Sequence, residues 1–224
     1  MGLLSTDAAT GSNGAVVAPA LPKGGGAIRG IDESFAANPA TGTASFTVTL
    51  PVSPGRSGFT PELSLSYDSG SGNGPFGLGW SLNLPAISRR LDRRVPGYGS
   101  DDVFMLTGQD DLVPVLEPDG AAGLRHGTAA RGEFDVDRYR PRVEGMFGRI
   151  ERWVHRTSGD IHWRTISRDN VTTVFGGTPD SRIADPADPG RVVSWLASAG
   201  YDSRGNAMAY EYVAEDSANV AAGA

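Results

Sequence analysis

Three carboxylates alternate along one stretch of the chain, at Glu133, Asp135 and Asp137. In an extended strand, alternate residues point to the same side and lie about 7 Å apart. That spacing suits a calcium site or a glycosidase pair, whose carboxyl groups are separated by about 5 to 9.5 Å. No Asn/Gly-rich calcium loop follows, and nothing marks a buried general acid. The favoured interpretation is therefore an edge strand whose charges prevent pairing with other chains.

Two histidines and three arginines lie on the next predicted hairpin, whose turn is Ser158–Asp160. With that turn, His155 opposes Trp163, and His162 points to the other face. One zinc ion cannot be reached from both faces of a strand pair, which argues against a metal site. The face of His162 also carries the candidate interaction residues Arg152, Arg156 and Arg164. A basic face in contact with solvent is the simpler interpretation of these arginines.

The other signatures of chemistry are missing from the sequence. It has no cysteine and no GxSxG or HExxH motif, and Gly70–Gly74 lacks the spacing of a nucleotide-binding loop. We therefore predict no catalytic residue, no cofactor and no metal. The net charge of −6 and pI near 5.0 argue against nucleic acid as a partner. Arg89–Arg94 contains a short basic cluster, read as a solvated strand end or a docking patch.

Composition and periodicity predict an all-β fold. The 31 glycines and 15 prolines make up about a fifth of the 224 residues, too many for long helices. The clearest hairpin joins Leu63–Tyr67 to Phe76–Leu84, since apolar residues alternate along both runs. Trp80 is predicted to be buried there and Gly79 to be tightly packed. Further antiparallel hairpins are expected on both sides of it.

The expected organisation has five ranges. They are a disordered leader at 1–20, a first β-hairpin region at 21–116, a loop excursion at 117–132, a second β-meander at 133–213 and a tail at 214–224. The strands expected in these regions are Ala44–Val52, Val103–Leu106, Leu112–Leu116, Ile150–Thr157, Ile161–Ile166, Val171–Phe175, Val192–Ala197 and Ala207–Val213. The Ala/Gly-rich end favours a segment of a longer protein.

Several motifs resemble, in order, the N-terminal region of the SpvB virulence-protein family, which includes the B components of Tc insecticidal toxin complexes. They are LPKGGGAI at 21–28, YDSRGN at 201–206 and the glycine-rich motif, with Gly72, Asn73, Pro75, Phe76, Gly77, Leu78, Gly79 and Trp80. The resemblance implies antiparallel hairpins forming part of a larger RHS-type β shell. It also implies a noncatalytic structural role, with any ADP-ribosyltransferase domain lying beyond these residues.

The partners that the resemblance implies are a toxin C component or C-terminal effector region, and the pore-forming A component. No signal peptide is evident in Met1–Ala20 and no membrane span is predicted. Release by another route, or a cytoplasmic location before release, is therefore expected. Two other classes stay open. A carbohydrate-binding β domain would use Trp153, Trp163 and Tyr139, and a hydrolase would use the carboxylates of 133–137.

Overall fold

The computed structural model describes residues 33–38, 42–74, 76–99, 101–120, 123–145 and 148–213. The predicted all-β class is confirmed: these residues form strands β1 to β19 and two short 3-10 turns, η1 (Arg56–Gly58) and η2 (Pro179–Ser181). All strand pairs in the main sheets are antiparallel. No helix among the described residues has the length and apolar character needed to cross a membrane. The leader at 1–20, Lys23–Gly26 and the tail at 214–224 lie outside the described residues.

The first sheet has four strands in the order β1-β2-β3-β6. Their bounds are β1 Glu33–Asn38, β2 Thr43–Thr49, β3 Ser64–Asp68 and β6 Trp80–Leu82. The β3–β6 pairing confirms the expected hairpin, and the Ala44 run, also expected as a strand, pairs with the Leu63 run. Leu65 lies opposite Leu82, and Tyr67 lies opposite Trp80.

The second run of that hairpin is shorter than predicted. Between β3 and β6, the strands β4 (Asn73–Gly74) and β5 (Gly77–Leu78) pair with each other and form a separate small hairpin, here called the tongue. Gly77 and Gly79 adopt φ of +96° and +78°, a region that favours glycine, and they bend the chain out of the sheet. Alternation alone did not reveal these two bends.

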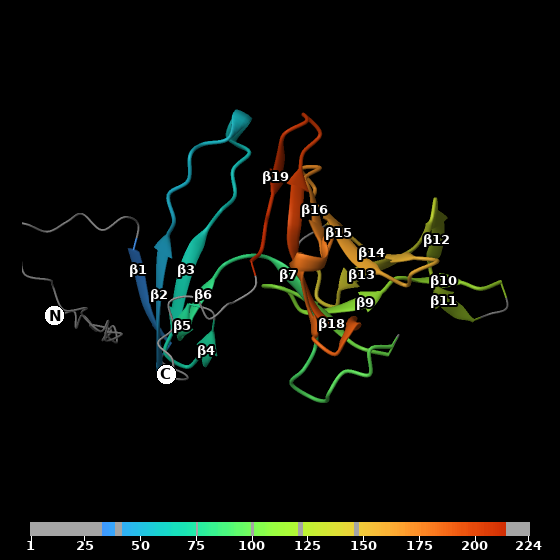
Figure 1. Ribbon diagram of the computed structural model, residues 1–224, viewed down its shortest axis with the longest axis horizontal. Coiled ribbons are helices and arrows are strands. Elements are labelled where there is room, and N and C mark those ends of the chain that lie inside the picture. The colour runs from blue at the N-terminus through green and yellow to red at the C-terminus, as the bar shows by residue number, and fades with distance from the viewer. Residues whose placement is uncertain are drawn as a thin grey trace, which may run out of the picture.

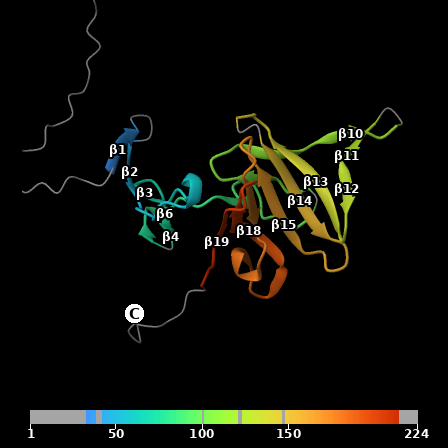
Figure 2. The same ribbon diagram turned by 90° about the horizontal axis from the view of Figure 1, so that it is seen from above.

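The second sheet closes into a barrel (Figures 1 and 2). Its strands follow the order β13-β14-β15-β16-β18-β7-β8-β9, and β9 pairs back onto β13, so eight strands form a closed ring. The bounds are β7 Ala86–Arg89, β8 Phe104–Leu106, β9 Asp111–Pro114, β13 Phe134–Pro141, β14 Arg149–His155, β15 Ile161–Ile166, β16 Thr172–Phe175 and β18 Asp188–Tyr201. Closure pairs the outer strands of the sheet with each other and so removes two sheet edges.

Five short strands flank the barrel. They are β10 Leu116–Pro118, β11 Leu124–His126, β12 Thr128–Arg131, β17 Arg182–Asp185 and β19 Ala207–Ala209. The expectation of a loop at 117–132 is therefore wrong, because β10, β11 and β12 fall within or across that range. These strands are exposed, and their sparse apolar content gave no alternation to detect. Barrel strands come from both sides of this range, so the sheet crosses the expected boundary.

Aromatic and aliphatic side chains fill the barrel. The buried hydrophobic residues of this core are Ile87, Phe104, Leu106, Leu112, Tyr139, Ile150, Trp163, Phe175, Val192, Trp195 and Ala197. Trp163 is at its centre, with ring centroids 4.9 Å from Phe104, 5.1 Å from Tyr139 and 6.0 Å from Trp195. An eight-stranded barrel is just wide enough for side chains to fill it, so this one is a packed core.

A buried ion pair completes the interior. Arg89 donates to the Asp102 carboxylate at 2.6 Å and to the Val192 carbonyl oxygen at 2.8 Å. Its guanidinium also lies 5.1 Å from the Phe104 ring centroid. The basic cluster was read as a solvated strand end or a docking patch, and for Arg89 both readings are wrong. Arg90 is also paired, with Asp92 and Asp111.

Candidate functional site

The predicted arginine face is divided between the two sides of the barrel wall. In the β14–β15 hairpin, Arg152 lies opposite Trp163, and Trp153 lies opposite His162. The prediction had placed His155 opposite Trp163. The observed register differs from the predicted one by an odd number of residues, so the β14 side chains that were predicted on one face of the hairpin lie on the other. The cause is a longer turn, closed by a hydrogen bond from the His155 N–H to the Asp160 carbonyl oxygen.

Each of the three candidate arginines consequently has its own surroundings. Arg152 lies on the core side, where it pairs with Asp137 at 3.3 Å and lies 5.8 Å from the Phe104 ring centroid. Arg156 pairs with Asp135 at 2.8 Å. Arg164 lies on the outer side, over the Trp153 ring. They do not form one basic patch.

The predicted carboxylate run belongs to an interior strand. β13 pairs with β12, β14 and β9, so the prediction of an edge strand is wrong. Asp135 and Asp137 are each neutralised by an arginine of β14 or its turn, and Glu133 precedes the strand with an 85% exposed side chain. Paired in this way, the carboxylates are not available as a general acid and base.

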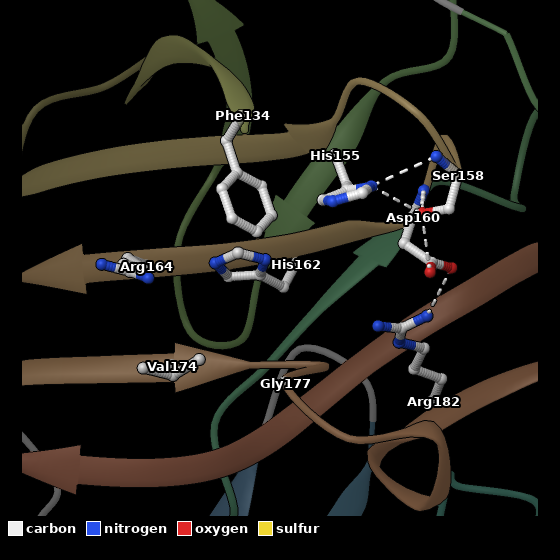
Figure 3. Close-up of a pocket in the computed structure, with 9 residues that line it drawn as sticks. All are labelled: Phe134, His155, Ser158, Asp160, His162, Arg164, Val174, Gly177 and Arg182. Carbon is white, nitrogen blue, oxygen red and sulfur yellow. Dashed lines mark hydrogen bonds and ion pairs between the residues drawn. The ribbon is translucent and has the colours of Figure 1, made fainter. Parts of the chain in front are cut away.

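A cavity of about 430 Å³ lies on the outer wall of the barrel (Figure 3). It is lined by Phe134, His155, Ser158, Asp160, His162, Arg164, Val174, Gly177 and Arg182. The sheet is interrupted here, because β16 ends at Phe175 and the chain loops through η2 before β17 begins at Arg182. Because β16 pairs only with Trp163–Ile166, the first two residues of β15 have no β16 partner beside this loop, and the hollow lies there.

A polar network at one end of the cavity brings a serine, a histidine and an aspartate together (Figure 3). The Ser158 hydroxyl donates to Asp160 at 2.9 Å, and the Ser158 N–H donates to His155 Nδ1 at 3.1 Å. Hydrogen bonding from Ser158, followed by that from Arg182, lowers the pKa of the Asp160 carboxyl. In a hydrolytic triad the aspartate orients the histidine, whereas here it contacts the serine directly. Ser158 Oγ also lies 3.0 Å from His155 Nδ1, where the donor depends on the histidine tautomer. These hydrogen bonds stabilise the turn between β14 and β15.

The middle of the cavity is aromatic and basic. His162 stacks on Trp153 with ring centroids 5.7 Å apart and meets the edge of Phe134 at 5.3 Å. Burial, together with the charges of Arg164 and Arg182, lowers the pKa of His162 to about 4. This histidine is therefore neutral at pH 7. The described residues contain no group of three or more His, Cys, Asp or Glu side chains that could hold a metal ion.

The glycine-rich motif lies at a distance from this cavity, in the first sheet and its tongue. Phe76 and Leu78 at the tongue are 51% and 70% exposed. Gly79 is buried, and a Cβ at this position would lie 2.6 Å from Tyr67 Cε2, which confirms the predicted tight packing. Trp80 is only half-buried, so its expected full burial is wrong. Gly72 and Asn73 are exposed, and Pro75 lies outside the described residues.

Sequence reasoning missed the cavity as a site. The lining of the cavity brings together residues that are distant in the sequence. Asp160 and Arg182, for example, are 22 residues apart and are joined by a hydrogen bond of 3.1 Å. The sequence analysis singled out three lining residues, His155, His162 and Arg164, but it placed His155 on the other face, and it interpreted Ser158-Gly159-Asp160 only as a turn. No pattern in the sequence indicated that β17 would bring Arg182 to this position.

A model of the family described as Salmonella virulence plasmid 65kDa B protein matches residues 38–224. The chain belongs to the SpvB family. The mono(ADP-ribosyl)transferase SpvB of Salmonella typhimurium is 35% identical over 210 residues, which are 92% of this chain and 34% of that protein. The chain thus spans about a third of the length of this curated relative.

Solved structures of SpvB-family proteins have the same fold. The crystal structure of TcdB2-TccC3 matches with a TM-score of 0.72 and 37% identity, over 93% of this chain and 10% of that chain. The N-terminal domain of the effector SpvB from Salmonella typhimurium strain LT2 matches with a TM-score of 0.68 and 34% identity, over 79% of this chain and 57% of that chain. The Photorhabdus luminescens Tc holotoxin pore matches with a TM-score of 0.71 and 36% identity, over 92% of this chain and 10% of that chain.

Proposed function

We propose that this chain is a noncatalytic structural module of a bacterial toxin and forms part of a β shell that encloses or carries a toxic effector. The observation that carries the proposal is an apolar face of the four-stranded sheet that the described residues cover only in part. This apolar sheet face consists of Phe46, Val48, Leu65, Tyr67, Trp80 and Leu82. All six side chains are only half-buried, and no residue of β2, β3 or β6 is fully buried. A sheet with one apolar face needs a second layer against it.

The family relationship supports the same role. TcdB2 chains, which this chain resembles over 93% of its length, are solved together with TccC3. A toxin C component or C-terminal effector region is therefore the proposed partner, and the pore-forming A component is the second. We place any ADP-ribosyltransferase activity outside these residues, because the chain matches only a third of SpvB. Release by a route that needs no signal peptide belongs to the same proposal.

A chimaera tests the shell role directly. The matching segment of TcdB2 would be replaced by this chain and co-expressed with TccC3. We expect a stable complex in which Trp80 is shielded from a soluble quencher, whereas Trp80 in the isolated chain is accessible. A chimaera that folds but neither retains TccC3 nor shields Trp80 would contradict the proposal.

The structure argues against the carbohydrate-binding alternative. A sugar platform needs exposed aromatic rings, but Trp163 is 0% exposed and Tyr139 is 6% exposed. Only Trp153 remains near the surface, where Arg164 covers one face of its ring at 3.9 Å. Binding of a protein partner is left as the second candidate function, and the outer cavity supplies the observation that favours it.

A further inference from the structure

Arg164 is a cation without a counter-ion on the wall of the outer cavity. Among the residues that the structure describes, no side chain or carbonyl group accepts a hydrogen bond from its guanidinium, and its Nε is enclosed without a partner. The carboxylate on the facing strand, Glu151, already accepts from Trp153 Nε1 at 3.1 Å and pairs with Arg149 at 3.0 Å. An enclosed charged group that lacks a partner is unfavourable, so binding of an anion here would be stabilising.

The remaining charges around the cavity do not supply that anion. Asp160 is held by Arg182 at 3.1 Å, and Glu133 extends toward His155 at 3.6 Å with its side chain largely in solvent. Arg164 and Arg182 both line the cavity, and their charges add to the effect of burial in lowering the pKa of His162. The cavity therefore favours negative charge although the whole chain carries a net charge of −6.

The shape and lining of the cavity indicate what accompanies the charge. Phe134, Val174 and the neutral ring of His162 offer an apolar surface beside Arg164 (Figure 3). The volume of about 430 Å³ lies in the range of about 300–1,000 Å³ that is typical of ligand pockets. Because Nε is enclosed, the terminal amino groups of Arg164 are the donors that a ligand would reach.

We propose that this cavity binds an acidic–apolar peptide segment of a protein partner, with an Asp or Glu carboxylate on Arg164 and a neighbouring apolar side chain against Phe134 and Val174. Stacking on Trp153 holds the guanidinium in one orientation before the ligand arrives, which reduces the entropy lost on binding. Arginine is suited to this role because its planar donors match a carboxylate. The inference is independent of the shell role, since the cavity and the apolar sheet face are different surfaces.

Binding would be measured by NMR titration of the full 224-residue chain with acetyl-Leu-Glu-Phe-amide and its uncharged analogue acetyl-Leu-Gln-Phe-amide. We expect the acidic peptide to bind about tenfold or more tightly than the analogue, as for a hydrogen bond to a charged group. The titration midpoint of His162 should rise in the complex, because the carboxylate offsets the charge of Arg164. Equal affinity for the two peptides would overturn the proposal without any variant being made.

Two variants and a matched control locate the site. Arg164→Gln should remove the preference for the acidic peptide, and Arg164→Met should do the same while keeping the aliphatic stem that packs on Trp153. Arg168→Gln makes the same charge change at a residue that is 78% exposed and does not line the cavity, and it should bind normally. An equal loss in Arg168→Gln, or binding of acetate or inorganic phosphate as tight as that of the peptide, would show general attraction of anions and overturn the proposal.

Discussion

Gly79→Ala is the sharpest test of how the glycine-rich motif holds the first sheet. A Cβ at this position would lie 2.6 Å from Tyr67 Cε2 and 2.8 Å from the backbone oxygen of Asp68. The backbone cannot move without disturbing the hydrogen bond of 2.9 Å from the Asp68 N–H to the Gly79 carbonyl oxygen. The positive φ costs about 1–2 kcal/mol for alanine and the overpacking about 1–3 kcal/mol. Reduced freedom of the unfolded chain offsets about 0.4–1 kcal/mol, which leaves a net destabilisation of about 1–5 kcal/mol.

Two neighbouring glycines separate these contributions. A Cβ at Gly77 meets nothing within 4 Å, but φ there is +96°, so Gly77→Ala should show the backbone cost alone. Gly72 has neither a close neighbour nor a positive φ, and Gly72→Ala should be neutral or slightly stabilising. From the most to the least stable variant, the expected order is therefore Gly72→Ala, Gly77→Ala and Gly79→Ala.

The assay must report on the first sheet and not only on the barrel. Trp80 is the tryptophan of that sheet, and the other three of the chain's four lie on barrel strands, at positions 153, 163 and 195. Denaturant unfolding followed by the fluorine NMR signal of 5-fluorotryptophan at Trp80 therefore isolates the relevant transition. If Gly79→Ala and Gly77→Ala unfold at the same denaturant concentration, the close packing of Gly79 contributes nothing and the reasoning is refuted.

The remaining predictions concern the core, the charges and the apolar sheet face. Trp163→Ala should lower the free energy of unfolding of the barrel by about 3–5 kcal/mol, measured by denaturant titration. Arg89→Ala should lower it by up to about 3–5 kcal/mol, because the buried Asp102 loses its close partner and keeps only the more distant Arg94, at 3.6 Å; an unchanged denaturation midpoint would contradict this. The pKa of His162 is about 4 in the folded protein and about 6.5 in the unfolded chain, so the unfolded chain binds the proton first as the pH falls from about 6.5 to 4. The free energy of unfolding should therefore fall over this range by at most about 3 kcal/mol, and by less after solvent screening. The reference at each pH is the variant His162→Gln. Leu65→Asn should reduce the concentration-dependent self-association of the chain, measured by sedimentation. A sedimentation profile equal to that of the unsubstituted chain would show that the apolar sheet face does not cause the self-association.

Strands and their pairing partners could be predicted where the pattern is local. Alternation in Leu63–Tyr67 and Ala44–Val52 indicated β3 and β2, which are consecutive in the chain and pair with each other. The turn at Asp202–Asn206 was also readable, because the Asp202 carboxylate accepts from the N–H groups of Arg204 and Asn206. These features depend on neighbours in the sequence, which is what periodicity and turn chemistry report.

The faces of the barrel wall could not be predicted in the same way. A turn of a different length between β14 and β15 exchanges the two faces of a hairpin, and no residue in Ser158–Asp160 excludes the shorter turn that was assumed. Closure of the barrel could not be predicted either, since the β9–β13 pairing joins residues that are 25 to 29 positions apart in the sequence. The sequence therefore suggested that Arg89 and Arg152 are exposed to solvent. Closure of the barrel instead places Arg89 in the core and Arg152 at the margin of the core.

The two sheets differ in how complete they are, and this difference assigns them different roles. The barrel closes on itself, fills its interior with aromatic rings and neutralises Arg89 with Asp102. Within the part of the chain that the structure describes, the first sheet ends in two edge strands, β1 and β6, and has an apolar face that is only half-buried. Unpaired edges and a half-buried apolar face favour association with another layer. Stability should thus depend mainly on the barrel, and assembly on the sheet: a change such as Leu65→Asn on the apolar sheet face should weaken assembly while the barrel still unfolds at the same denaturant concentration.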